Sequence, residues 1–122
     1  MALSTLALIL VSVTMSAFAQ IAFKFGVTAA REGDASTSAA GTLLSFLLSP
    51  GVIVGLALYG VGTLLWLSVL SRVEVSQAYP FVGLGFVLTA ILGAVLFGDV
   101  LTMPRITGIA LVMLGIYFIA RS

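Results

Sequence analysis

The stretch SAFAQIAFKFG, residues 16–26, places a glutamine and a lysine four residues apart inside an otherwise apolar segment. Two structures fit it: a signal peptide that ends at the cleavage site Ala17-Phe18-Ala19, or a membrane helix with one polar face. A signal peptide has a basic region before its apolar part. No lysine or arginine precedes Ala17, and the apolar pattern continues to Phe25. The stretch therefore favours a membrane helix.

The composition supports this setting. Of the 122 residues, 61% are hydrophobic and 7% are charged, and the mean hydropathy is +1.32. A soluble domain has roughly a quarter of charged residues because water must solvate its surface. Five basic and four acidic residues cannot cover such a surface, so we expect lipid to surround the protein.

Four stretches are long enough to cross a membrane. A bilayer core of ~30 Å needs ~20 apolar residues in a helix, and the expected spans cover about residues 3–25, 49–71, 76–97 and 104–120. Backbone groups find no water in the bilayer core, so each span must be helical. We predict an all-α membrane protein, with residues 1–122 as a single four-helix transmembrane domain.

The segment between the first two spans has two parts. Residues 26–41 are polar and small, which is typical of a flexible loop. Residues 42–48 are too short to cross, and form either an interfacial helix or an early extension of the second span. Ser49 can cap that span and Pro50 can occupy its first position.

Several classes of function are excluded by what the chain lacks. It has no cysteine and no histidine, so thiolate metal sites, zinc chemistry and a histidine base are unavailable. The net charge of +1 offers no basic field for nucleic acid, and no Gly-rich phosphate loop is present. We expect a protein that is not an enzyme and has no cofactor, no metal and no nucleic-acid partner.

A polar stripe runs along the first span. Ser12, Ser16, Gln20 and Lys24 follow one another at four-residue spacing, which places them on nearly one helix face. Serines also serve ordinary helix packing, and a lone lysine can anchor at the headgroups. The amide of Gln20 needs polar partners in a low-dielectric place. We therefore favour a functional stripe that faces a wet cavity.

The chemistry of this stripe suits an anion. The acidic residues lie in loops or at helix ends; they are Glu32, Asp34, Glu74 and Asp99. Export of a lipophilic cation usually needs a carboxylate inside the membrane. An ammonium and an amide suit a phosphate or carboxylate instead, and Arg105 could add a second cationic contact.

Two glycine patterns suggest close helix contacts. Gly108 and Gly115 lie two turns apart on one face of the last span, and Gly51 and Gly55 have Gly-x-x-x-Gly spacing. Small residues let helices approach closely. Four helices leave little room for a substrate between them, so we predict a dimer, either a homodimer or a heterodimer.

The third span contains AYPFVGLGF, residues 78–86. Pro80 falls near its first turn, and Gly83 and Gly85 invite a bend. Tyr79 is either an aromatic-belt residue or part of an aromatic lip on a bendable helix that opens and closes a chamber.

Several segments in order resemble one family. They are Gln20-x-x-x-Lys24, ALYGVGTLLWLSVL at residues 57–70, EVSQAYPFVGLGFV at residues 74–87 and LFGDVLTMPRITGIALVMLGIYFI at residues 96–119. Together they resemble four-helix EamA-type members of the drug/metabolite transporter superfamily. Within it, the chain is similar to the flippase subunits that move aminoarabinose-linked undecaprenyl phosphate across the bacterial inner membrane.

The chain is also similar to the small multidrug resistance exporters. That resemblance implies a small multidrug resistance-like bundle in which Gly108 and Gly115 form a dimer contact. Those exporters have an essential glutamate eight residues before their first-helix lysine, where this chain has Ser16. The serine argues against proton/drug antiport.

The flippase resemblance implies roles for individual residues. Lys24 would bind the phosphate of a lipid-linked anionic sugar, and the sugar would contact Gln20, Ser16 and Ser12. Tyr79 and Trp66 would offer ring faces, while membrane lipid surrounds the polyprenyl tail. Two alternatives remain: an exporter of small cations or metabolites, and a non-transporting membrane subunit of a glycolipid-modifying complex.

Overall fold

The computed structural model describes residues 2–33 and 38–122, and this part of the chain is helical with no strand. Its elements are α1 (Leu3–Gly33), α2 (Ala39–Leu48), α3 (Pro50–Leu70), α4 (Val75–Ala78), the 3-10 turn η1 (Tyr79–Phe81), α5 (Val82–Leu96) and α6 (Met103–Arg121). Four segments are long and apolar enough to cross a membrane: α1, α3, the α4–η1–α5 segment and α6. The predicted all-α class with four membrane-length helices is confirmed.

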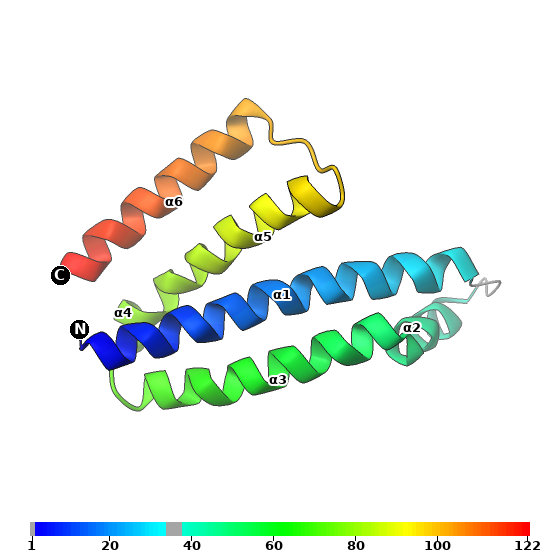
Figure 1. Cartoon of the computed structure of the whole chain (residues 1–122), viewed down its shortest axis with the longest axis horizontal. Coiled ribbons are helices and arrows are strands. Elements are labelled where there is room, and N and C mark those ends of the chain that lie inside the picture. The colour runs from blue at the N-terminus through cyan, green and yellow to red at the C-terminus, as the bar shows by residue number, and fades with distance from the viewer. Residues whose placement is uncertain (1, 34–37) are drawn as a thin grey trace.

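Helix α1 packs along α3, and both termini of the chain lie at the same end of the bundle (Figure 1). Glycines allow this close approach: a Cβ at Gly51 would lie 2.6 Å from the Cα of Gly26. A Cβ at Gly55 would lie 2.5 Å from the Phe23 ring. The Gly51/Gly55 pattern therefore packs helices within one subunit.

The segment between α1 and α3 differs from the expected loop. Helix α1 continues to Gly33, and residues 39–48 form the separate helix α2. Asp34 lies outside the described residues. Ser49 has an extended backbone conformation, which interrupts the helix between α2 and α3. Pro50 takes the first position of α3 as expected. The Ser49 hydroxyl does not cap α3; it donates to the carbonyl oxygen of Gly26 at 2.9 Å.

The third span is interrupted at its proline. Residues 79–81 form one 3-10 turn between α4 and α5, because Pro80 has no backbone N–H to continue the α-helical pattern. Gly83 and Gly85 lie just beyond this turn, inside the regular helix α5, and both are buried. A Cβ at Gly83 would lie 2.7 Å from the Val112 side chain of α6, so this glycine lets α5 and α6 approach.

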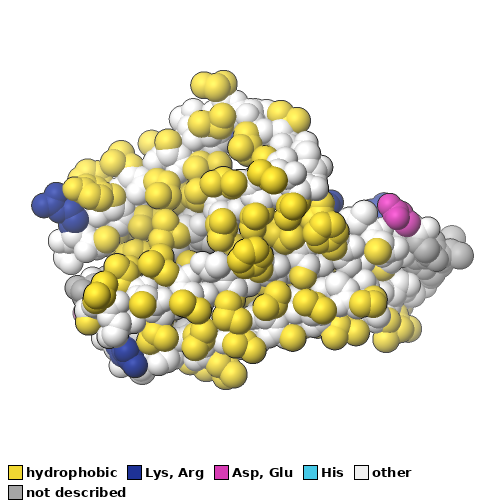
Figure 2. Space-filling model, viewed as in Figure 1, with side chains coloured by type: hydrophobic (Ala, Val, Ile, Leu, Met, Phe, Trp, Pro, Cys, Tyr) yellow, Lys and Arg dark blue, Asp and Glu magenta, His cyan; other side chains and the backbone are white. Residues whose placement is uncertain are grey.

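The apolar core lies at the end of the bundle that holds the termini. Ile9, Val13, Val69, Phe81 and Ile116 form one buried cluster there, with Ala78. Helix α6 contributes only Ile116 to the buried residues, and most of its surface is exposed. Figure 2 shows hydrophobic side chains over most of the visible face and basic side chains near the ends. This distribution is the one that lipid requires of a membrane protein's exterior.

Candidate functional site

A cavity of about 730 Å³ lies between α1, α3 and the third span. We call it the central groove. Its polar and aromatic lining comes from all three segments and from the turn after α5: Ser12, Ser16, Gln20, Tyr59, Thr63, Trp66, Tyr79, Phe86, Thr89 and Asp99. The groove opens sideways, because Tyr59, Tyr79 and Phe86 are 48%, 62% and 66% exposed. The groove is therefore a slot that is open along one side.

The residues of the polar stripe on α1 have different surroundings: one packs against α3, and others expose polar atoms to the groove. Ser12 is buried, and its hydroxyl donates to the carbonyl oxygen of Gly62 at 2.8 Å, which ties α1 to α3. Ser16 is half-buried and Gln20 is exposed. Neither of these two side chains hydrogen-bonds to any residue that the structure describes. Ser16 and Gln20 are thus the members whose polar atoms are available to a ligand.

Lys24 lies outside the groove lining, at one boundary of the bundle. Its side chain is exposed and forms no hydrogen bond or ion pair within residues 2–33 and 38–122. The next residue, Phe25, contacts Phe97 with ring centroids 4.7 Å apart. Lys24 is therefore at the level where α5 ends, one helical turn beyond Gln20.

Arg105 does not join the stripe. Its guanidinium Nη1 donates to the carbonyl oxygen of Val100 at 2.6 Å. The side chain lines a separate apolar groove of about 350 Å³ between α5 and α6. This second groove shares Phe86 and Ala90 with the central one, so Arg105 is next to the site rather than in it.

Helix α3 supplies more of the site than Trp66, the one residue of this helix that was predicted to bind substrate. Trp66 and Tyr79, both predicted, line the groove, and so do Tyr59 and Thr63. Tyr59, Thr63 and Trp66 are four and three residues apart, which is one helix face. This spacing is the pattern in the sequence that could have placed Tyr59 and Thr63 beside Trp66. The Thr63 hydroxyl donates to the Tyr59 carbonyl oxygen at 2.8 Å, which fixes its rotamer.

Asp99 is the one acidic side chain in the groove lining, and no basic side chain lines the groove. The prediction that it lies in a loop or at a helix end is confirmed, since Asp99 lies between α5 and α6. No periodicity links this residue to the helices, so its place at the groove depends on the fold of the turn after α5.

The glycines expected at a dimer contact have open space beside them on α6, and Gly108 lines the apolar groove between α5 and α6. A Cβ at Gly108 or Gly115 would meet no described atom within 4 Å. Both glycines are exposed on α6. Gly83, Gly85 and Pro80, expected at a bend, lie around η1 next to the groove.

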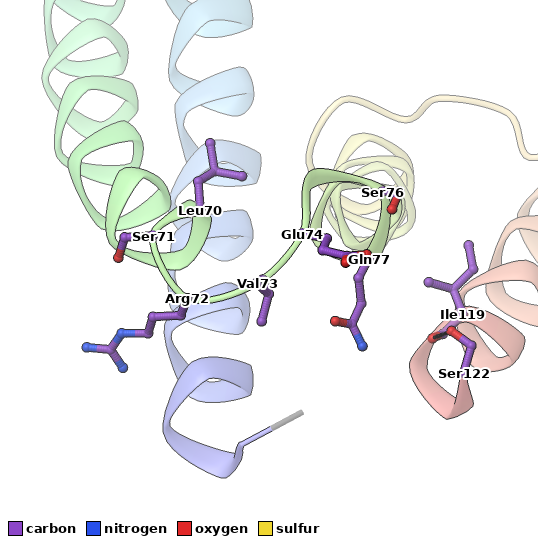
Figure 3. Close-up of a pocket in the computed structure, with 9 residues that line it drawn as sticks. All are labelled: Leu70, Ser71, Arg72, Val73, Glu74, Ser76, Gln77, Ile119 and Ser122. Carbon is purple, nitrogen blue, oxygen red and sulfur yellow. Dashed lines mark hydrogen bonds between the residues drawn. The ribbon is translucent and has the colours of Figure 1, made fainter.

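Another cavity, of about 710 Å³, lies at the end of the bundle that holds the termini (Figure 3). It is formed by the turn between α3 and α4 and by the last residues of the chain. Figure 3 shows the Arg72 side chain directed away from Gln77, Ile119 and Ser122. None of the predicted binding residues lines this cavity. No group of three or more metal-ligating side chains occurs among the described residues.

Comparison with known proteins gives close relatives. No protein-family model matches the chain, and no solved structure does. A protein of Pseudomonas savastanoi pv. phaseolicola is 34% identical over 108 residues, which cover 88% of this chain and 90% of that protein. It is named "probable 4-amino-4-deoxy-L-arabinose-phosphoundecaprenol flippase subunit ArnE".

Two further relatives extend the match. The protein with the same name in Pseudomonas aeruginosa UCBPP-PA14 is 33% identical over 95% of this chain and 96% of its own length. An uncharacterised protein of Sinorhizobium fredii, y4nH, is 38% identical over 74% of this chain and 78% of its own length. With its four membrane-length helices, this chain is a multi-pass protein of the bacterial inner membrane. It belongs to the family of the ArnE flippase subunits.

Proposed function

We propose that this chain is a transporter subunit, rather than an enzyme, that moves a polyprenyl-phosphate-linked sugar between the leaflets of the inner membrane. The observation that carries the proposal is the central groove, which holds unbonded polar side chains and opens to lipid. The relatives support it, since their names state a lipid-linked amino sugar and a flippase.

The groove suits the two unlike parts of such a lipid. Ser16 and Gln20 replace water around the sugar, which lowers the free-energy barrier of carrying hydroxyl groups through the bilayer core. The lateral opening beside Tyr59 and Phe86 leaves the polyprenyl chain in the bilayer. Trp66 and Tyr79 offer ring faces to the sugar.

Lys24 is proposed to bind the phosphate at the membrane boundary. Its ammonium has no partner among the described residues, and a compact cation is a good ligand for phosphate oxygens. Arg105, from the neighbouring groove, would approach the same anion only after its bond to Val100 breaks. We therefore assign the main phosphate contact to Lys24.

A second candidate function is export of a small soluble cation, which the place of Asp99 in the groove favours. A carboxylate inside a transport path is the group such an exporter needs. If this function holds, expression of the chain raises the tolerance of cells to toxic amines, and the variant Asp99→Asn abolishes that protection.

The proposed function is tested in membrane vesicles from the source organism, with the gene intact, deleted or restored. A membrane-impermeant amine reagent modifies the amino-sugar lipid in the outer leaflet only, and mass spectrometry counts the modified fraction. We expect deletion to lower the rate of appearance in the outer leaflet at least about tenfold, a change of about 1.4 kcal/mol in the barrier. Equal rates in vesicles with and without the gene would contradict the proposal.

The same vesicles test the role of Lys24. Restoring the gene as Lys24→Gln should give no more transport than deletion, because the phosphate loses its cation. Arg31→Gln is the matched control, since Arg31 is an exposed cation farther along α1. Full transport by Lys24→Gln would remove this residue from the site and leave the flippase proposal intact.

A further inference from the structure

The turn after α5 directs Asp99 back onto the helix. Gly98 has φ of +72°, a backbone conformation that favours glycine. The backbone N–H groups of Phe97 and Asp99 both donate to the carbonyl oxygen of Gly93, at 3.0 and 3.2 Å. The left-handed Gly98 and the bond from the Asp99 N–H to the carbonyl oxygen six residues earlier end the helix. Together they turn the chain back over the last turns of α5.

The Asp99 carboxylate rests directly on Gly93. A Cβ added at Gly93 would lie 2.5 Å from the carboxylate Oδ2, so only glycine leaves room for the carboxylate at this place. The two glycines thus have one joint effect. Gly98 folds the chain back, and Gly93 lets the acidic group lie against α5 at the groove.

This carboxylate has no counter-ion in the described part of the chain. It forms no ion pair and accepts no hydrogen bond there, and every other residue of the groove lining is uncharged. A negative charge at the edge of a low-dielectric slot is stabilised by any cation that enters it. The chemistry of the groove therefore selects a ligand with a positive group.

We propose that Asp99 binds the protonated amine of a lipid-linked amino sugar and selects it over an uncharged sugar. The inference rests on the proposed function and names the part of the substrate that the site distinguishes. Asp99 and Lys24 lie at one boundary of the bundle, as the contact between Phe25 and Phe97 indicates. A headgroup with one amine and one phosphate has the complementary pair of charges.

The remaining lining fits the neutral part of this headgroup. Gln20 and Ser16, on α1, have free hydrogen-bonding atoms for sugar hydroxyls. Neither residue can distinguish an amine from a hydroxyl strongly, because both donate and accept hydrogen bonds. Discrimination between the two headgroups therefore depends on the carboxylate.

The experiment uses the fluorescence of Trp66, the single tryptophan of the chain, which lines the groove. Purified protein in lipid nanodiscs is titrated with two synthetic polyprenyl-phosphate sugars that differ only in an amine or a hydroxyl at one position. We expect the wild-type protein to bind the amine lipid about tenfold more tightly, the size of one charge-assisted contact at a partly exposed site.

Two variants change the carboxylate or its position. Asp99→Asn should bind the amine lipid only as tightly as the wild-type protein binds the hydroxyl lipid. The affinity for the hydroxyl lipid itself should not change. Gly93→Ala should reduce the preference several-fold, because the new methyl group displaces the carboxylate while alanine favours the helix. Glu74→Gln, a carboxylate at the other end of the bundle, and Gly60→Ala, which meets no neighbour within 4 Å, should both keep the full preference.

Each result decides a different point. Equal affinity of the wild-type protein for both lipids, or a preference that persists in Asp99→Asn, would overturn the role of Asp99 and leave a flippase without amine selection. A wild-type protein that binds neither lipid would overturn the proposed function together with this inference.

Discussion

At the scale of single residues, the glycines between α1 and α3 set how closely these helices approach. Gly26, Gly51 and Gly55 all meet the opposing helix in the space where a side chain would begin. In a membrane the association of helices depends on such packing, because lipid removes the hydrophobic driving force between them. A larger residue here must separate two helices that are in contact along the groove.

We predict that Gly51→Val lowers the free energy of unfolding by about 3 kcal/mol, since the opposing atoms belong to the backbone of Gly26 and Ala22 and cannot move aside. Thermal unfolding in detergent, followed by Trp66 fluorescence, measures the change. Gly60→Val is the control on the same helix, because that position has open space around it. Equal stabilities of the two variants would contradict the packing argument.

At the scale of helices, the start of α3 depends on α1. The Ser49 hydroxyl is buried and bonds the Gly26 carbonyl oxygen at 2.9 Å, in place of capping its own helix. This bond holds the break between α2 and α3 against the last third of α1. The break therefore has a fixed place along the bundle.

Replacing Ser49 by alanine should lower the free energy of unfolding by about 1 kcal/mol, the usual net value of one buried hydrogen bond. Hydrogen exchange should also speed up at the first turn of α3 more than at its last turn. Ser71→Ala is the control, because the Ser71 hydroxyl is exposed and bonds the Ser68 carbonyl oxygen nearby. Uniform faster exchange along α3 would argue against a local anchor.

The helices and part of the groove lining could be predicted from the sequence. Four apolar stretches, each long enough for a helix to cross the bilayer core, predicted the helices. Within one segment of chain, only a helix bonds all of the backbone groups in the absence of water. Ser16 and Gln20 were predictable for the groove because helical spacing places them on one face. Lys24 and Arg105 lie outside the groove lining. Their distance from the groove depends on how the helices pack, which the spacing along the chain does not give. Asp99 reaches the groove through a left-handed turn at Gly98, and no periodic pattern encodes that position.

At the scale of the whole molecule, α6 is the least buried of the four membrane-length helices. Its one buried residue is Ile116, and Gly108 and Gly115 present bare backbone on its exposed surface. The relatives are named subunits, which fits a protein that works with a second chain. We propose that α6 packs against another subunit, either a copy of this chain or a similar one.

The dimer proposal predicts that Gly108→Leu and Gly115→Leu weaken self-association or association with the second subunit at least about tenfold, since a large side chain keeps the two backbones apart. Affinity purification from native membranes at several detergent concentrations, with the subunit ratio measured by mass spectrometry, tests this. The monomer fold should persist, because a Cβ at either glycine would meet no described atom within 4 Å. Gly60→Leu provides the comparison, being equally open but on α3. If Gly60→Leu separates the subunits while both α6 variants stay assembled, the contact is on the α3 side, and the apolar surface of α6 faces lipid.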